Sequence, residues 1–441
     1  MVAPDRAGRG IIKSLNMTVS GEKLTIGLLG VEDPADVRSY SGTPFHLSHF
    51  LRAAGHTVRA LGPYPLRYRG IVRVQNRLAM MTLDQQLLWE RHALITAQYP
   101  EVVDKYVERN PDLNLLLATS AFMIAKVQTK LPVILWGDTT VAGVLGKYPR
   151  YVRLSERSII RAHVVEQDGL NACDLAIFSN QWAADVAMSS YHLDPAKVRV
   201  ITYGPGLVRV PDEAEIARLL SQRGQDRINL IIIGVHWERK GVAKAIEVTE
   251  ELRYRGVDAR LTILGCLPPP KFVNPGYVSL PGNISKFSAE GVRQIAQLLG
   301  ESHLLILPTM AECAAVSLVE ANAFGVPFLS TDVGGNYSLV RQNYNGILVP
   351  LGAGVSTWAE AAISILHGRE NYERFAWQAY DYFHQRLSWE HAVSDFEMAV
   401  HELLGTTVLQ GECTTRKSSD FDEGPQCHSA GTKAHSGVSP R

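Results

Sequence analysis

Cysteine is scarce in this chain of 441 residues, and its few cysteines show no regular spacing. There are five, an odd number, and none belongs to a Cys-x-x-Cys pair. A disulfide framework or a structural zinc site needs cysteines that pair at short spacings, so we expect neither. This usage is typical of a reducing compartment, and the sequence therefore predicts a cytoplasmic location.

An excess of charge of one sign and a long apolar run are also missing. The 44 Lys and Arg residues balance 44 Asp and Glu residues, which removes any chain-wide case for nucleic-acid binding. The longest apolar runs, such as Leu113–Ala118, are far shorter than the ~20 residues of a membrane span. Met1–Lys23 has no apolar run of the kind found in secretory signals. We expect a soluble chain, for which peripheral contact with a membrane stays open.

The sequence does contain a regular alternation of short β-branched runs with helical patterns, which is typical of parallel sheets covered by helices. It therefore predicts an α/β protein with two doubly wound, Rossmann-like domains that face a central cleft. The predicted strands are Leu24–Leu29, Val58–Leu61, Leu113–Leu117, Val133–Trp136, Leu175–Phe178, Val198–Thr202, Leu230–Ile233, Leu261–Leu264, Leu304–Leu307 and Phe328–Ser330.

The turn-rich stretch Tyr203–Gly206 marks the change from one domain to the next. From Gln410 onward the only large apolar residues are Phe421 and Val438, which cannot build a core. The Asp420-Phe-Asp422 triplet in this region resembles a metal-binding motif, but no strand precedes it and we expect no role for it. The expected divisions are a flexible arm at 1–23, a first domain at 24–205, a second domain at 206–370, crossover helices at 371–405 and a disordered tail at 406–441.

Two glutamates follow the strand that ends at Leu307. Glu312 lies in the loop at the carboxyl end of that strand, and Glu320 lies on the inward face of a helix predicted near 316–325. A carboxylate that points at a core is costly unless it is paired or holds a ligand. The N–H groups of Ala314–Ser317 at the start of this helix can receive an anion. The two glutamates could therefore address one ligand; alternatively, Glu320 pairs with a neighbouring cation and Glu312 caps the helix.

Two adjacent cations follow the strand Leu230–Ile233. Arg239 and Lys240 lie in the loop that leads into a helix predicted near 242–255. Arginine offers a planar fork and lysine a point charge, both suited to phosphate, and the helix N-terminus adds positive potential. Unless they form an ordinary exposed pair, these cations and the two glutamates indicate a site for a diphosphate and a polyhydroxyl group.

With these residues in place, the sequence resembles the family-four retaining glycosyltransferases, which have the GT-B fold of two facing Rossmann-like domains. The strongest mark is a Glu-x7-Glu motif at Glu312 and Glu320, and the resemblance covers about residues 24 to 400. Further matching stretches are 237–241 (Trp-Glu-Arg-Lys-Gly), Thr331–Gly335, Asn345-Gly346, Ser41–Pro44, Ile134–Asp138 and Ser179–Trp182.

The resemblance implies a role for each matching residue and C-terminal helices that pack back on the first domain. Glu320 would hydrogen-bond the ribose of a nucleotide-sugar, and Glu312 would lie near the donor sugar. Arg239 and Lys240 would neutralise the leaving diphosphate, and Gly42, which has no side chain, would let a first-domain loop approach it. The other implied donor-site residues are Cys313, Ala314, Ala315 and Val316 at the helix start and Asp138 in the first domain.

The sequence departs from the family pattern in three places. Val235 stands where many members have an arginine after the strand's glycine, so Arg239 has to supply the second cation. Cys-Ala-Ala follows Glu312 where Gly-Phe-Gly is common, although these small side chains still permit close approach. Asp138 stands where many relatives have a histidine, which puts its acceptor-side role in doubt.

The resemblance implies a hexosyltransferase-type enzyme that acts with retention of configuration. It would move a sugar from a nucleotide-sugar donor to a hydroxyl group of a glycan, lipid or small-molecule acceptor. We expect no metal and no separate cofactor, because Arg239 and Lys240 already serve the leaving diphosphate. The competing hypothesis is a non-catalytic nucleotide-sugar or glycan-binding protein of the same fold. The sequence does not indicate an oligomeric state.

Overall fold

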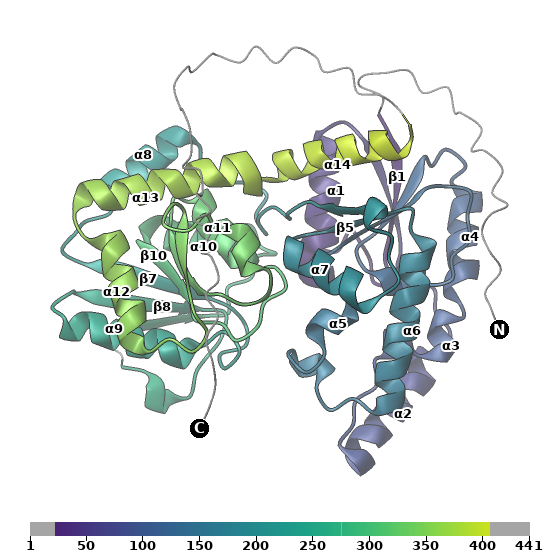
Figure 1. Cartoon of the computed structure of the whole chain (residues 1–441), viewed down its shortest axis with the longest axis horizontal. Coiled ribbons are helices and arrows are strands. Elements are labelled where there is room, and N and C mark those ends of the chain that lie inside the picture. Colours follow the sequence, from purple (N-terminus) through teal and green to yellow (C-terminus); the bar gives the residue numbers. More distant parts are fainter. Residues whose placement is uncertain (1–22, 275, 406–441) are drawn as a thin grey trace, which may run out of the picture.

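The computed structural model describes residues 23–274 and 276–405. They form two α/β domains, each built on a parallel sheet of six strands, which lie side by side in Figure 1. The predicted arm up to residue 22 and the predicted tail at 406–441, with Asp420-Phe-Asp422, lie outside the described residues. Lys23, which the sequence places in the arm, belongs to the fold, because its Nζ donates to the Ala54 carbonyl oxygen at 2.6 Å.

The first sheet has the strand order β2-β1-β3-β4-β5-β6, and every neighbouring pair is parallel. Its central strands are buried on both faces, as their unbroken apolar sequences predict. All six strands predicted for this half are present, each within two residues of its expected ends. The strands are β1 Thr25–Leu29, β2 Thr57–Leu61, β3 Leu115–Ala118, β4 Val133–Gly137, β5 Leu175–Phe178 and β6 Val198–Val200.

The second sheet is also parallel, with the order β12-β11-β10-β7-β8-β9. The four strands predicted for this half form its centre, whereas β9 and β12 at its two edges were missed. The strands are β7 Ile228–Ile233, β8 Ala259–Leu264, β9 Val278–Gly282, β10 Leu304–Leu307, β11 Phe328–Thr331 and β12 Gly346–Val349. The two sheets confirm the predicted α/β fold with two doubly wound domains.

Helices cover both sheets. In α1, Leu47 and Leu51 lie one turn apart and are fully buried in the first-domain core, as the apolar spacing predicts. No helix within residues 23–274 and 276–405 combines the length and the apolar character needed to cross a bilayer. The α-helices are α1 Thr43–Ala53, α2 Arg69–Leu83, α3 Ala93–Thr96, α4 Tyr99–Arg109, α5 Val141–Val144, α6 Glu156–Ala172, α7 Gln181–Ser190, α8 Glu213–Gln222, α9 Val242–Tyr254, α10 Ala289–Glu301, α11 Val316–Ala323, α12 Val355–Leu366, α13 Arg369–Tyr382 and α14 Trp389–Leu403.

The last helix returns the chain to the first domain. Figure 1 shows α13 beside α8 and α11 of the second domain, and α14 running on to cover α1 and β1. The Phe396 ring stacks on Trp136 of β4 with centroids 5.4 Å apart, and Glu397 pairs with His56 at 2.9 Å. Trp389 Nε1 donates to the carbonyl oxygen of Pro205 at 2.9 Å. The predicted return is confirmed, and α14 is the helix that makes it.

Candidate functional site

A cavity of about 650 Å³ lies between the two domains. Its walls include the residues that directly follow four strands: Thr119 after β3, Asp138 after β4, Gly234 after β7 and Gly265 after β8. Ligands of doubly wound proteins bind outside the carboxyl ends of the strands. The cavity therefore lies where the strand pattern predicts a cleft.

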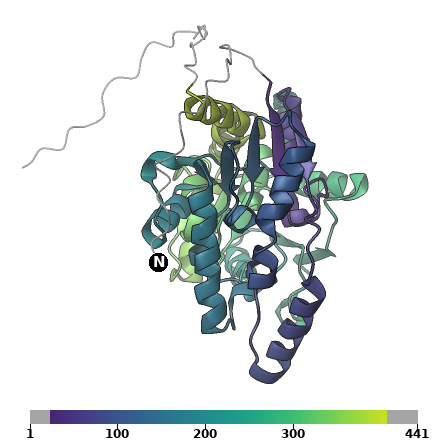
Figure 2. The same cartoon turned by 90° about the vertical axis from the view of Figure 1, so that its right-hand side faces the viewer.

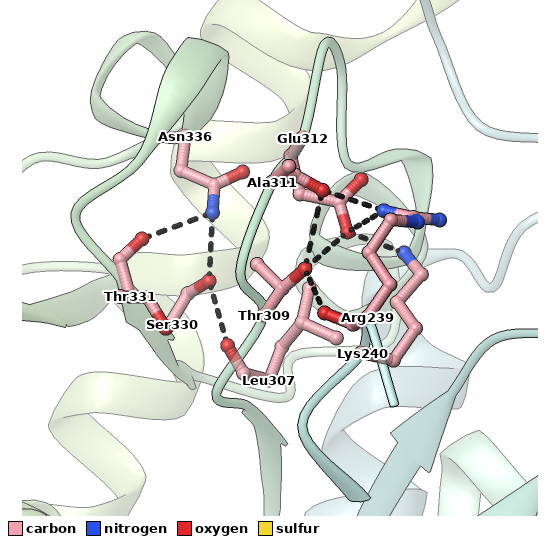
Figure 3. Close-up of polar contacts among 9 residues, drawn as sticks. All are labelled: Arg239, Lys240, Leu307, Thr309, Ala311, Glu312, Ser330, Thr331 and Asn336. Atoms are coloured by element: carbon pink, nitrogen blue, oxygen red, sulfur yellow. Dashed lines mark hydrogen bonds and ion pairs between the residues drawn. The ribbon is translucent and has the colours of Figure 1, made fainter. Parts of the chain in front are cut away.

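The second-domain wall holds a compact charged cluster, drawn in Figure 3. One carboxylate oxygen, Glu312 Oε1, accepts from Lys240 Nζ at 2.7 Å, Arg239 Nη1 at 3.0 Å and Thr309 Oγ1 at 2.9 Å. The side chains of Glu312, Lys240 and Arg239 are 5%, 11% and 13% exposed. The sequence-predicted cations and the first glutamate thus meet at one point of the cavity, and the cations are not an exposed surface pair.

The charges of this cluster set the ionisation of its carboxyl group. Burial by itself raises the pKa of Glu312, but the nearby charges of Lys240 and Arg239 and the hydrogen bonds to them lower it by more, so the pKa lies below its ordinary value. Two cations against one carboxylate leave a net positive charge at this wall. Such a wall favours an anionic group of a ligand.

A second set of hydrogen bonds holds the Glu312 loop in place. Gly334 has a left-handed backbone (φ 55°), and a Cβ there would lie 1.8 Å from the Glu312 carbonyl oxygen, so only glycine fits. Asn336 Nδ2 donates to Ser330 Oγ at 2.9 Å, and Ser330 Oγ donates to the Leu307 carbonyl oxygen at 3.1 Å (Figure 3). The ends of β10 and β11 are therefore fixed together behind the cluster.

The second glutamate lies on α11 with its side chain fully buried. Glu320 Oε1 accepts from the N–H of Gly206 at 3.1 Å and forms an ion pair with Lys286 Nζ. The other oxygen, Oε2, is buried and has no hydrogen-bond partner among the residues that the structure describes. The sequence alternative in which Glu320 pairs with a cation is therefore present. Lys286 was missed because it follows β9, an edge strand that the sequence did not reveal.

The start of α11 offers fewer N–H groups than the sequence predicts. The N–H of Val316 donates to the Ala314 carbonyl oxygen at 3.0 Å and so is not free for an anion. Cys313, Ala314 and Val316 line the cavity, but Ala315 does not and is almost completely buried. The Cys313 carbonyl oxygen accepts from Asn180 Nδ2 of the first domain at 2.7 Å. Cys313 is buried, and burial raises the pKa of its thiol, which disfavours the nucleophilic thiolate form.

In the first domain, Gly42 is the N-cap of α1 and adopts a left-handed conformation with φ 85°. Gly42 itself does not line the cavity; its neighbours Tyr40 and Thr43 do. The glycine sets the turn by which the flanking residues reach the cavity wall. That this loop approaches a diphosphate stays a prediction.

Asp138 is the first residue after β4, and its carboxyl group faces the cavity. The surrounding walls limit hydration of the carboxylate and raise its pKa to about 6, although backbone N–H groups of Asp138 and Thr139 oppose the rise. The charge of Glu166 adds to it. The pKa of Asp138 therefore lies above the ordinary value of an aspartate, although the residue is exposed to the cavity.

Beyond Asp138, the first-domain wall contains a buried ion pair that the sequence analysis missed. Arg91 Nη2 lies 3.0 Å from Glu166 Oε2, and the side chains are 7% and 3% exposed. Arg91 Nε and the hydroxyl groups of Thr119 and Thr140 are buried and lack a hydrogen-bond partner within the described part of the chain. These groups line the cavity wall with unused polar atoms.

Comparisons with known proteins support the resemblance stated from the sequence. Residues 216–382 match the model of the family described as glycosyl transferases group 1. Among curated proteins, the D-inositol 3-phosphate glycosyltransferase of Gordonia bronchialis is 24% identical over 52% of this chain and 52% of its own length. The lipopolysaccharide glucosyltransferase WaaG of Escherichia coli is 27% identical over 33% of this chain and 40% of its own. The chain thus spans about half the length of the curated relatives it matches.

Solved structures match almost the whole described chain. Sucrose-phosphate synthase from Thermosynechococcus elongatus is 16% identical, with a TM-score of 0.61 over 87% of this chain and 100% of that one. The structure of WaaG, a glycosyltransferase involved in lipopolysaccharide biosynthesis, is 14% identical, with a TM-score of 0.56 over 85% and 99%. We conclude that the chain has the two-domain fold of the GT-B glycosyltransferases and that its second domain matches the group 1 glycosyl transferases.

Proposed function

We propose that this protein is a retaining glycosyltransferase that takes a sugar from a nucleotide-sugar donor. One observation carries the proposal: the cationic cluster around Glu312 and the buried Glu320 carboxylate line the same cavity. The first supplies positive charge for a diphosphate, and the second supplies an acceptor for hydroxyl groups of a ribose. The match of residues 216–382 to the group 1 family supports it, as does an Anabaena structural neighbour described in complex with UDP.

Lys240 and Arg239 would act on the leaving group. In the proposed step the bond between the sugar's anomeric carbon and the diphosphate oxygen breaks, and negative charge develops on the diphosphate. Both cations are nearly buried, so their attraction to that charge is little screened by water. Glu312 holds both side chains in position and keeps part of their charge compensated until the diphosphate arrives.

The acceptor hydroxyl group would attack on the face from which the diphosphate departs. The new bond joins its oxygen to the anomeric carbon, and its proton passes to the departing phosphate oxygen. This route needs no side-chain base, and we propose that the enzyme also needs no metal ion.

The acceptor would lie against the first-domain wall. Arg91, Glu166, Thr119 and Thr140 line that wall, and their polar side chains include both hydrogen-bond donors and acceptors. A polyhydroxyl acceptor fits such a surface. Glycan, lipid-linked and small-molecule acceptors all carry such hydroxyl groups.

A donor screen followed by a transfer assay tests the function. Nucleoside diphosphates and nucleotide-sugars should raise the melting temperature, since a ligand at 100 times its Kd adds about 2.7 kcal/mol to the stability. The stabilising donor should then release nucleoside diphosphate, and proton NMR of the product should show the donor's anomeric configuration. Binding without turnover would identify a non-catalytic nucleotide-sugar-binding protein. An inverted product would exclude the retaining mechanism.

A further inference from the structure

Helix α2 of the first domain carries its apolar side chains on the outside. Val72 is its one buried residue. Four large apolar side chains recur at positions i, i+3, i+7 and i+10, the spacing that aligns them along one face of a helix. They are Ile71 (51% exposed), Val74 (60%), Leu78 (56%) and Met81 (76%). We call this row the α2 stripe.

The α2 stripe points away from the protein. Val72 and Asn76 attach the opposite face of α2: Val72 is buried in the first-domain core, and Asn76 Oδ1 accepts from the N–H of Leu87 at 2.7 Å. Figures 1 and 2 both show α2 at the lowest edge of the first domain, on the side opposite α14. A surface helix that faces only water does not usually carry a continuous row of large apolar side chains. The α2 stripe therefore indicates an interaction surface.

The charges within α2 itself have one sign. Residues 67–83 contain four arginines and no Asp or Glu. Arg73 and Arg77 are exposed, lie on one flank of the stripe and have no ion-pair partner in the described parts of the chain. The adjacent segment 147–161 contains five cations and one glutamate, and Arg153 of this segment pairs with Asp84 at the end of α2 at 2.8 Å.

We propose that α2 docks on the surface of an anionic lipid bilayer. In that position the α2 stripe lies at the level of the headgroups and upper acyl chains, while Arg73 and Arg77 contact lipid phosphates. A helix from a second copy of the protein is a poorer match to the α2 stripe. The stripe spans about three turns, less than the three to four heptads of a stable coiled coil, and it carries only cations.

The proposal also connects to the cavity. Tyr148 and Tyr151 line the cavity, and Arg153 and Leu154, a few residues further on, contact the segment that follows α2. Docking through α2 would therefore bring one cavity wall near the bilayer. The docking itself does not rest on the proposed function, because it can be measured without any substrate.

Sedimentation with lipid vesicles tests the proposal on the full-length chain. We expect binding to vesicles of phosphatidylcholine with phosphatidylglycerol, little binding to phosphatidylcholine alone, and weaker binding at high salt. The double variant Leu78→Asp with Met81→Asp should bind the anionic vesicles at least about tenfold less, since each lost apolar contact weakens partitioning. Arg73→Gln with Arg77→Gln should reduce both the binding and its salt dependence.

Leu351→Asp is the matched control, because Leu351 is as exposed as Leu78 (56%) but lies in the second domain. It should bind vesicles like the unchanged protein, and circular dichroism should show that all variants are folded. Absence of binding to anionic vesicles, or full binding by the Leu78→Asp, Met81→Asp variant, would overturn the proposal. A dimer that this variant dissociates would assign the α2 stripe to a second copy. If vesicle binding appears only after deletion of residues 1–22, the α2 stripe is instead the docking site of that segment in the full-length chain.

Discussion

Lys240 Nζ lies 2.7 Å from Glu312 Oε1, and Arg239 donates to the same oxygen. The two cations proposed to stabilise the leaving diphosphate therefore share one carboxylate atom. Their positions are fixed by this contact before any substrate binds, so little reorganisation is needed during the reaction. Removal of one partner should change the reaction more than the fold of the domain.

Lys240→Ala should lower kcat by about two powers of ten, the scale of losing one preorganised charge stabiliser. The effect falls on kcat because the charge on the diphosphate develops as the bond breaks. Lys244→Ala is the control: Lys244 lies one turn further on and donates to the Ala353 carbonyl oxygen. Steady-state kinetics with the donor that binds would measure both. A near-normal kcat for Lys240→Ala would contradict the role given to this lysine.

Glu320→Gln should raise the donor KM and change kcat much less. An amide keeps the shape of the side chain, but a charge-assisted hydrogen bond worth about 1.5–3 kcal/mol becomes an ordinary one. A ribose contact of this kind is equally strong before and during bond breaking, so its loss weakens binding. The comparison variant is Lys286→Met, which removes the ion-pair partner and leaves the carboxylate. If Glu320→Gln abolishes turnover at saturating donor, Glu320 acts in the chemical step.

Asp138→Asn should stabilise the protein above about pH 6 and not at about pH 4. The pKa of Asp138 is raised from 3.8 to about 6, so the folded state holds this proton more tightly than the unfolded chain does. Stability therefore falls as the pH rises through this window, and the cost persists above it. The asparagine side chain does not ionise, so the variant does not lose this stability. Melting temperatures of both proteins across this pH range would show a difference that grows with pH; a constant difference would contradict the raised pKa.

Dialysis against a strong chelator should leave donor turnover unchanged. The leaving diphosphate has two protein cations within the cavity, which take the place that a divalent ion has in metal-dependent transferases. Activity would be measured after dialysis and again after addition of Mg²⁺ or Mn²⁺. Complete loss with recovery on addition of either ion would show that the cations of the protein are not sufficient.

The central strands, and the edge of the sheets at which the site lies, could be predicted because each has a signal in the local sequence. Central parallel strands such as β3 and β10 are short, unbroken apolar runs. Arg239 and Lys240 lie in the loop after the central strand β7, and Glu312 lies in the loop after β10. The carboxyl ends of parallel strands lie at one edge, so residues 72 positions apart were expected to meet, as Lys240 and Glu312 do. Glu320 was found because a charge on an apolar helix face is conspicuous.

The rest of the site has no such local signal. Strand β9 alternates in burial and contains Pro281, and its edge position leaves it without the apolar run that marks a central strand. Lys286 follows β9 and was lost with it. Arg91 and Glu166 are 75 positions apart, and each looks like an ordinary helix-surface charge until the fold buries both. The hydrogen bond from the Val316 N–H to the Ala314 carbonyl oxygen depends on the local backbone conformation, which the sequence does not determine.

The bond from Trp389 to Pro205 also defines how the two domains can move. The chain passes between the domains twice, near Pro205 and again before Trp389, and this bond fastens the two passages together. A rotation about an axis through them would preserve this bond, whereas the hydrogen bond from Asn180 to Cys313, which joins the two domains away from that axis, would have to lengthen. A small rotation about that axis would displace the cavity edge furthest from it by a larger distance. Opening of the cavity by such a rotation would therefore need little deformation within either domain.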